Sequence, residues 1–421
     1  MAFVVLPLGI AMTERKTYYF DNNATTRVAP EVVEAMLPFL RDFWGNPSSA
    51  YSFGSQVAKK IEVAREKVAA LIGADPKEVV FTSCGTESNN AVLESALATQ
   101  PGKRHILTTA VEHSAIIKHG EWLQKQGAQV TFLPVDADGT LDLHLLDQSI
   151  RPDTALVSVM WANNETGVVF PVEEIAAICR SRGVLFHTDA TQAPGKLKID
   201  LGEVEVDFLT LSAHKLHAPK GVGLLYTRRR TKFQPYLIGG HQERGKRGGT
   251  ENVASIVGFG RAAELAVERM RDENTRVRAL RDRLEETLLR TVPNTLRNGA
   301  KEPRLPNTTN IAFDFVEAEG ILMMLDELGI CASSGSACTT GSLNPSHVLT
   351  AMGIKPARAK GCVRFSLGCY NTAEEVDYLL AHVPQVIARL REAAPDKAAK
   401  ARPAKHTAGH PPAAPAERLP K

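Results

Sequence analysis

Apolar residues recur along this chain in two alternating patterns, and each pattern predicts a different element. From Val57 to Leu71 they lie three or four positions apart, which predicts an amphipathic helix, and Gly73 is placed to end it. Strands are predicted where short apolar runs lie between such stretches, at residues 79–81, 105–108, 130–133, 156–159, 184–186, 208–211 and 223–226. Strands that alternate with helices predict an α/β domain with a mostly parallel sheet.

The pattern changes near residue 272, where a long charged helical segment covers residues 274–291. The region after it mixes strands with a loop of small residues and ends in a helix near residues 373–390. We therefore expect a large domain at residues 26–272 and a smaller α/β domain at residues 273–393.

Both chain ends differ from this folded body. Residues 1–11 are apolar, but they lack a basic stretch and contain Pro7 and Gly9, so they match a signal peptide only weakly. The segment is also too short to span a bilayer. We expect a disordered or misassigned extension, with Met12 as the true start. Residues 394–421 are rich in Ala, Pro and Lys, which predicts a disordered basic tail.

Composition is that of an ordinary globular protein, with 43% hydrophobic and 23% charged residues in 421. The formal net charge is +3, but residues 395–421 hold six Lys and Arg against two Asp and Glu, so the body carries 3 − 4 = −1. A body without net positive charge argues against a nucleic-acid surface. We also expect no membrane surface.

The six cysteines contain no C-x-x-C pair and no spacing typical of zinc sites or of dense disulfides. This usage favours a reducing, cytoplasmic location. Cys179 lies in a helical pattern and is expected in the core. Structural roles are expected for Cys331, Cys362 and Cys369.

Lys215 and Asp189 each follow an apolar run, in the stretches LSAHK (211–215) and FHTDA (186–190). A lysine amine forms a Schiff base with the aldehyde of pyridoxal phosphate (PLP), and a carboxylate pairs with the pyridine nitrogen so that the ring withdraws electrons. A lysine after a strand is more often an ordinary surface residue, but the surrounding residues favour a PLP site.

Three further segments carry candidate chemistry. Gly85 and Thr86 stand between a strand and a helix, where backbone N–H groups and a hydroxyl bind phosphate, although most such junctions are only caps. Cys338 lies in SGSACTTG (334–341), which reads as a mobile loop with an exposed thiol. Arg364 lies in an apolar strand-like run, where it binds either a substrate carboxylate or a structural partner.

Four motifs make the chain resemble the cysteine desulfurases of the class V aminotransferase group: YFDNNATT (19–26), GNPSS (45–49), VMWANNETG (159–167) and SAHKLHAPKG (212–221). The resemblance extends from about Tyr18 to about Leu390. Its HAP (217–219), MWA (160–162) and TTGSL (339–343) segments are similar to the nitrogen-fixation, NifS-like branch.

This resemblance implies the fold type I PLP-dependent transferase architecture, with a large domain around a mostly parallel seven-stranded sheet. Residues 12–25 are expected to pack with the small domain, and the protein is expected to be a homodimer. The implied phosphate ligands are Gly85, Thr86, Ser212 and His214, with Thr250 reaching across the interface to the phosphate of the partner subunit. Cys84 stands where relatives usually have glycine, which puts the backbone geometry there in question.

The remaining site residues are also implied by the resemblance. His113 would stack on the ring and move protons, and Gln192 would bind the phenolic oxygen. Asn164 would contact the same oxygen or the substrate carboxylate. Asn46 and Arg364 would hold that carboxylate.

The resemblance implies conversion of L-cysteine to L-alanine, with Cys338 as the nucleophile and Lys215 and His113 as proton carriers. The sulfur would pass as a Cys338 persulfide to an iron–sulfur scaffold protein, in the service of nitrogenase maturation, and Cys338 could transiently bind a [2Fe-2S] cluster. The alternatives are a PLP aminotransferase or β-lyase, which does not require Cys338, a selenocysteine lyase, and a non-enzymatic scaffold, which requires neither Lys215 nor Asp189.

Overall fold

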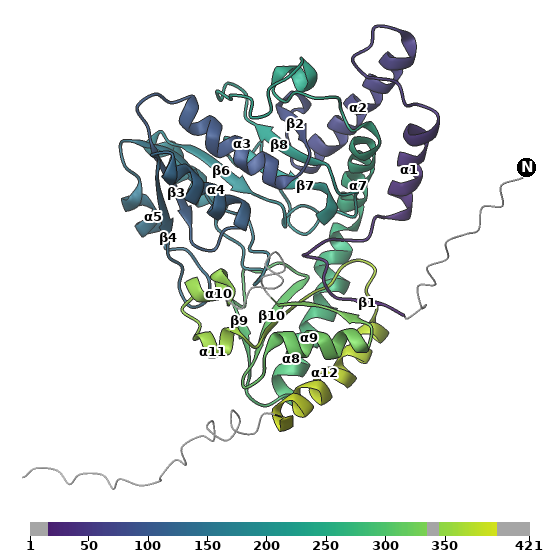
Figure 1. Ribbon diagram of the computed structural model, residues 1–421, viewed down its shortest axis with the longest axis vertical. Coiled ribbons are helices and arrows are strands. Elements are labelled where there is room, and N and C mark those ends of the chain that lie inside the picture. Colours follow the sequence, from purple (N-terminus) through teal and green to yellow (C-terminus); the bar gives the residue numbers. More distant parts are fainter. Residues whose placement is uncertain (1–15, 335–344, 394–421) are drawn as a thin grey trace, which may run out of the picture.

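The computed structural model describes residues 16–334 and 345–393. A seven-stranded sheet lies at the centre of the larger part (Figure 1), with strand order β2-β8-β7-β6-β5-β3-β4. Its strands are β2 (Val79–Thr82), β3 (His105–Thr109), β4 (Gln129–Leu133), β5 (Thr154–Ser158), β6 (Leu185–Asp189), β7 (Phe208–Ser212) and β8 (Gly223–Thr227). All seven predicted strands are therefore present, with ends that differ from the predicted ones by up to three residues.

Strand direction confirms the mostly parallel sheet, with one exception. Strands β3 to β7 pair with one another in parallel, whereas β8 is antiparallel to both β7 and β2. The connection between β7 and β8 spans only residues 213–222. A parallel crossover requires about a dozen residues or more, usually with a helix, so the chain turns back instead.

Helices cover both faces of the large sheet, because successive strand residues point to opposite sides (Figure 1). Val80 and Leu156 lie in one apolar core with Val92 of α3. Val79 and Val157 lie in a second core, on the other face. The helices of this part are α1 (Pro30–Arg41), α2 (Ser52–Leu71), α3 (Gly85–Ala98), α4 (Ser114–Lys125), α5 (Leu143–Ser149), α6 (Val172–Arg182) and α7 (Val253–Asp272), with the short 3-10 turns η1 (Pro76–Glu78), η2 (Ala213–Lys215) and η3 (Gln242–Gly245).

The predicted end of α2 is confirmed in detail. The helix stops at Leu71, and Gly73 follows with a φ of +62°. In this left-handed conformation Gly73 donates its N–H to Ala70 O, and Ala74 donates to Ala69 O. Glycine adopts this conformation without the steric cost that a Cβ imposes.

A second, four-stranded antiparallel sheet, named here the C-terminal sheet, has the order β12-β13-β10-β9. Beside it β1 pairs with β11, and Phe20 is fully buried in the same apolar core as Phe313 and Phe365. The elements are β1 (Tyr18–Tyr19), β9 (Thr295–Asn298), β10 (Thr308–Phe313), β11 (Ile330–Cys331), β12 (Ser333–Ser334), β13 (Cys362–Ser366), α8 (Arg278–Thr291), α9 (Ala318–Glu327), α10 (His347–Ala351), α11 (Pro356–Ala359) and α12 (Ala373–Ala393).

One continuous helical path joins the two parts. Helix α7 passes into the π turn η4 (Glu273–Val277), and α8 follows without a break. The predicted domain boundary between residues 272 and 273 coincides with the start of this π turn. Single π turns inside helices occur frequently at functional sites.

Within the described ranges, no helix combines the length and the apolar composition required to cross a bilayer. Cys179 is 1% exposed and lies in the large core, as predicted. The predicted segments 1–11 and 394–421 lie outside the described residues.

Candidate active site

A cavity of about 560 Å³ lies where strands of the large sheet meet the C-terminal sheet. This volume falls within the usual range for small-molecule sites, about 300–1,000 Å³. Strands β6 and β7 end at its wall, as expected for a site at the carboxyl edge of parallel strands. The predicted residues that line it are Gly85, Thr86, His113, Asn164, Asp189, Gln192, Ser212, His214, Lys215 and Arg364.

Lys215 is positioned by the turn η2, directly after β7. Its Nζ donates to Asn23 O at 2.5 Å and to Ala24 O at 2.7 Å. Gln192 Nε2 also donates to Asn23 O, at 3.1 Å. Two carbonyl oxygens therefore direct the amine of Lys215 toward a turn of the N-terminal segment, which was not predicted to form part of this site.

Asp189 ends β6 and is 6% exposed. Its two carboxylate oxygens accept hydrogen bonds from Asn89 Nδ2 at 2.7 Å and from the Thr191 N–H at 3.0 Å. These two hydrogen bonds fix the orientation of the carboxylate at the wall of the cavity.

The phosphate-sized end of the cavity is built by the start of α3 and by residues after β7. A Cβ on Gly85 would lie 3.3 Å from Thr191 Oγ1 and 3.4 Å from Ser212 Cβ, so glycine leaves the room that an anion requires. Helix α3 contains 14 residues, and the N–H groups of its first turn point toward this space. Thr86 is exposed to the cavity and supplies a hydroxyl.

The unusual Cys84 causes no backbone strain. Its φ is −174°, an extended conformation that any residue adopts. The close approach here depends instead on Gly223 of β8, because a Cβ at this position would lie 2.6 Å from the Cys84 carbonyl carbon. The doubt that Cys84 raised about the geometry of the site is therefore removed.

Two histidines of the site are neutral in this environment. Burial lowers the pKa of His113; the charge of Asp189 opposes this shift, and the charge of Lys215 adds to it. Burial lowers the pKa of His214 to about 4. His113 Nδ1 accepts the N–H of Ala115 at 3.1 Å, which leaves the proton of the neutral ring on Nε2. His113 thus lines the cavity as a neutral side chain with its proton on Nε2.

Arg364 is 1% exposed on β13 and lies between the two sheets. Its Nη2 donates to Asp21 Oδ1 at 2.7 Å, and its Nη1 donates to Asn164 O at 2.9 Å. Arg364 therefore has a structural ion-pair partner, Asp21, which was one of the two possibilities indicated by the sequence. Arg364 nevertheless lines the cavity, so it can also bind a carboxylate that enters there.

Two predicted residues do not line this cavity. Asn46 and Thr250 are both exposed, and Asn46 Oδ1 accepts the N–H of Ser48. The catalytic role predicted for Cys338 lies outside the described residues, as does its possible cluster ligation.

Sequence reasoning missed several residues that shape the cavity. His347 lines it and bonds through Nε2 to Glu112 O at 2.8 Å. Glu165 is buried and accepts a hydrogen bond of 2.5 Å from Ser346 Oγ. A signal was present for Ser346, since a serine before an apolar stretch is a common helix N-cap, and it caps α10 here. Nothing local to Glu112 or Glu165 marks them as buried carboxylates.

The residues of this cavity fit PLP. On its lining residues, Asn89 Oδ1, Gln192 Oε1 and Arg364 Nε are buried without a hydrogen-bond partner among the described residues. Such atoms in a native fold indicate contacts that a ligand completes. Together with an amine, a carboxylate and the glycine cradle, they form the donor and acceptor set that PLP requires.

Comparison with known proteins agrees with this geometry. The family model described as aminotransferase class-V matches residues 18–379. A cysteine desulfurase of Trichormus azollae is 54% identical over 379 residues, 90% of this chain and 95% of that protein. The cysteine desulfurase NifS of Azotobacter vinelandii is 53% identical over 378 residues, 90% of this chain and 94% of that protein.

Among solved structures, a NifS-like protein superimposes with a TM-score of 0.84 at 40% identity, and the match covers 89% of this chain and 100% of that one. The predicted fold type I architecture is thereby confirmed. By sequence, fold and site, the chain belongs to the class V aminotransferase family and, within it, to the PLP-dependent cysteine desulfurases.

Proposed function

We propose that this protein converts L-cysteine to L-alanine and retains the sulfur as a persulfide on Cys338, from which a protein acceptor takes it. The observation that carries this proposal is the convergence of Lys215, Asp189 and Arg364 on one cavity. An amine, a carboxylate and a guanidinium at one site are what binding of PLP and of an amino-acid substrate requires. Relatives that share about half of their residues with this chain support the same activity.

When bound, PLP supplies an electron sink that acidifies the α-carbon of an amino acid. We infer that Lys215 holds it covalently and that Asp189 faces its ring nitrogen. Gly85, Thr86, Ser212 and His214 would bind its phosphate. Gln192 lines the cavity and would contact its phenolic oxygen.

The amine of Lys215 lies at the wall of the cavity, where it would carry a proton. Its present acceptors are the carbonyl oxygens of Asn23 and Ala24, which are neutral. When its amine is not bonded to the cofactor, Lys215 would accept the α-proton of the substrate and return a proton to the product. His113, neutral and buried at the same wall, is the second candidate for this transfer.

Arg364 would bind the substrate carboxylate. Its Nε has no partner among the described residues, and its Nη2 contacts Asp21, which a substrate carboxylate would replace. Asn164 lines the same wall and would complete the contact, or reach the phenolic oxygen. This exchange of one carboxylate for another keeps the buried guanidinium paired throughout.

The sulfur transfer balances without an external oxidant. The Cys338 thiolate attacks the substrate sulfur, the C–S bond breaks and an S–S bond forms. L-cysteine and the Cys338 thiol thus give L-alanine and the Cys338 persulfide. A thiol reductant then releases sulfide, or an acceptor thiol takes the sulfur by exchange.

We further propose a homodimer in which Thr250 contacts the phosphate of the partner subunit and Asn46 helps to bind substrate. Both residues are exposed and lie near large exposed apolar side chains, Trp44 at 73% and Ile238 at 85%. Exposed apolar side chains of this size are typical of an interface. Neither residue lines the 560 Å³ cavity of its own chain, so each would act on the cavity of the partner subunit.

The proposed acceptor is a scaffold protein of iron–sulfur cluster assembly, and the likeness to NifS favours nitrogenase maturation. Transient binding of a [2Fe-2S] cluster by Cys338 belongs to the same proposal. A reducing cytoplasm suits a thiol that must stay free, and the five described cysteines form no disulfide.

The test is release of alanine and sulfide from L-cysteine by the purified protein with PLP and a thiol reductant. Equal amounts of the two products are expected, with loss of both in Cys338→Ala while the visible absorbance of the cofactor is retained. Full activity of that variant would replace the proposal by a β-lyase. Faster turnover of L-selenocysteine than of L-cysteine would favour a selenocysteine lyase. Transamination without release of sulfide would favour an aminotransferase.

A further inference from the structure

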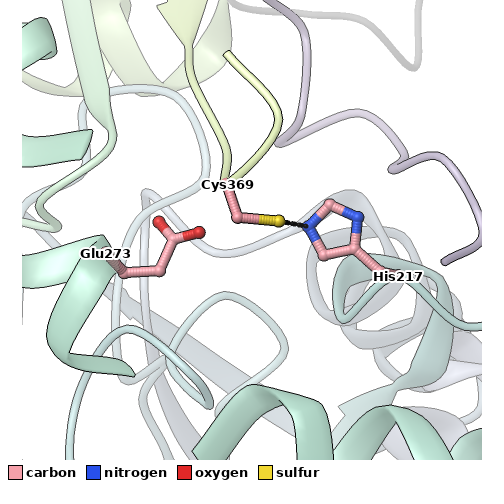
Figure 2. Close-up of side chains that lie close together, drawn as sticks. All are labelled: His217, Glu273 and Cys369. Atoms are coloured by element: carbon pink, nitrogen blue, oxygen red, sulfur yellow. Dashed lines mark hydrogen bonds between the residues drawn. The ribbon is translucent and has the colours of Figure 1, made fainter. Parts of the chain in front are cut away.

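His217, Glu273 and Cys369 form a cluster behind the proposed active site (Figure 2). His217 follows the turn η2 that carries Lys215, Glu273 begins the π turn η4, and Cys369 follows β13. One nitrogen, one carboxylate oxygen and one sulfur of the three all lie within 4.8 Å of one another. Cys369 Sγ is 3.6 Å from His217 Nε2. Three residues far apart in sequence thus present three types of metal-ligating atom to one point.

The hydrogen bonds of His217 orient its ring for ligation. Its Nδ1 lies 3.0 Å from Arg27 O, and a carbonyl oxygen can only accept, so Nδ1 carries the proton. Nε2 of the neutral ring then presents a lone pair toward Cys369 Sγ. A histidine that ligates a metal nearly always donates its other N–H to a carbonyl or carboxylate in this way.

Glu273 supplies the second, independent observation. The residue is 7% exposed, and its Oε2 is buried without a hydrogen-bond partner among the described residues. Its carboxylate points toward Cys369 (Figure 2), whose backbone N–H hydrogen-bonds to it. A buried carboxylate oxygen left without a partner is costly, and a bound cation removes that cost.

The space between these residues is part of a small cavity of about 30 Å³. Lys215 and Leu216 also line it, and Lys215 lines the 560 Å³ cavity as well, so the lysine is common to both. A cavity of this size holds about one water-sized species or one ion.

Neighbouring charges permit a divalent cation. Arg269 Nη1 lies 3.7 Å from Cys369 Sγ but pairs with Glu31 at 2.8 Å. Two further cations face the cluster: Arg276, which pairs with Asp272, and the half-buried Lys196, which donates to Gln192 O. A thiolate and a carboxylate together carry two negative charges, so a divalent metal ion with these two ligands forms a neutral unit beside these cations.

We propose that His217, Glu273 and Cys369 bind a zinc-like divalent cation, with water in the fourth position. Sulfur, imidazole and carboxylate together suit a borderline-soft ion such as Zn²⁺ and disfavour Mg²⁺ or Ca²⁺. The ion would tie the segment of Lys215 to the π turn and to the residue that follows β13. Because Arg364 lies on β13, the site would fix the lysine relative to the arginine.

The experiment uses the full-length, PLP-loaded protein in a Cys338→Ser background, which removes the loop thiol as a competing ligand. The protein is loaded with Zn²⁺ and dialysed, zinc is measured by mass spectrometry, and the ligands are identified by zinc-edge X-ray absorption. About one zinc per chain is expected, with one sulfur among its ligands. Adding Cys369→Ser should lower zinc affinity by more than roughly 100-fold. A loss of about 100-fold is the largest that removal of a residue outside the ligand set typically causes, so a larger loss identifies Cys369 as a ligand.

Cys331→Ser in the same background is the matched control, since Cys331 is another partly buried thiol near the C-terminal sheet and should retain zinc. Glu273→Gln keeps the shape of the side chain and gives a second test if Cys369→Ser fails to fold. No retained zinc, no sulfur ligand in the absorption spectrum, or unchanged affinity in a folded Cys369→Ser or Glu273→Gln variant would each overturn the site.

Discussion

The carbonyl oxygen of Asn23 lies 2.5 Å from Nζ of Lys215, although 192 residues separate them. The side chain of Asn23 explains why this carbonyl is fixed, because its Nδ2 donates to Asn164 O and Thr308 Oγ1, and its Oδ1 accepts from Asn307 Nδ2. One asparagine thus links the N-terminal segment to the C-terminal sheet, to the connection between β5 and α6, and to the lysine.

Asn23→Ala should therefore destabilise the protein by about 2–4 kcal/mol, since it leaves several buried polar groups without partners. Urea unfolding followed by circular dichroism measures this loss. Asn46→Ala, at an exposed site, is the control and should change stability by about 0.5 kcal/mol or less. Equal stabilities of the two variants would contradict the role of Asn23.

Lys215→Ala should reduce kcat by more than roughly 10³-fold, since it removes both the covalent attachment and the proton carrier. The absorbance spectrum of added PLP should also lose the band of the lysine-bound cofactor. Lys220→Ala, at an exposed lysine of the same motif, should retain both properties. Turnover by Lys215→Ala at a rate near that of the control would exclude the assignment.

Arg364→Lys should raise KM for L-cysteine, with a fall in kcat/KM of roughly 100-fold, because an ammonium cannot reproduce the two-pronged contact of a guanidinium. Arg358→Lys is a matched control, since Arg358 pairs with Asp314 away from the cavity. If Arg364→Lys lowered the free energy of unfolding but left kcat/KM unchanged, the only role of Arg364 would be its ion pair with Asp21.

Glu112 predicts a pH dependence of stability. Burial raises the pKa of this carboxyl from its ordinary value of 4.5 to about 8, against hydrogen bonds from Met160 and Thr109 that lower it. The folded protein therefore binds this proton more tightly than the unfolded chain does. The resulting stabilisation is complete below about pH 4.5 and is lost as pH rises to about 8. Over this range the free energy of unfolding should fall by on the order of 3–5 kcal/mol.

Glu112→Gln should remove this dependence, because an amide does not titrate. The free energy of unfolding, measured from pH 5 to pH 8, should fall less steeply in the variant than in the wild type. Glu173→Gln, at an exposed glutamate of α6, should keep the wild-type slope. Identical slopes in all three proteins would show that Glu112 is ionised in the fold.

The sheet and much of the site could be predicted because their signals are local. Each strand has its own apolar run, and Asp189 and Lys215 lie close together because they end, or directly follow, the neighbouring parallel strands β6 and β7. The reversed direction of β8 depends on the short connection before it, which an apolar pattern does not encode. The π turn at Glu273 was equally hidden, since its residues continue a helical pattern.

Contacts between distant segments could not be predicted in this way. The carbonyl of Asn23 is a backbone group, and any residue has one. His217 and Cys369 are 3.6 Å apart across the fold, but their spacing in the chain matches no ligand motif. Only the packing of the turn η2 against the segment after β13 brings them together.

The most direct test of the central claim is a single turnover without reductant, followed by peptide mass spectrometry. The protein, loaded with PLP, is mixed with L-cysteine, alkylated and digested, and alanine is measured in the same sample. We predict one added sulfur atom on the peptide that contains Cys338, with an equal amount of alanine. Alanine without added sulfur on that peptide, or sulfur on another cysteine, would contradict the account.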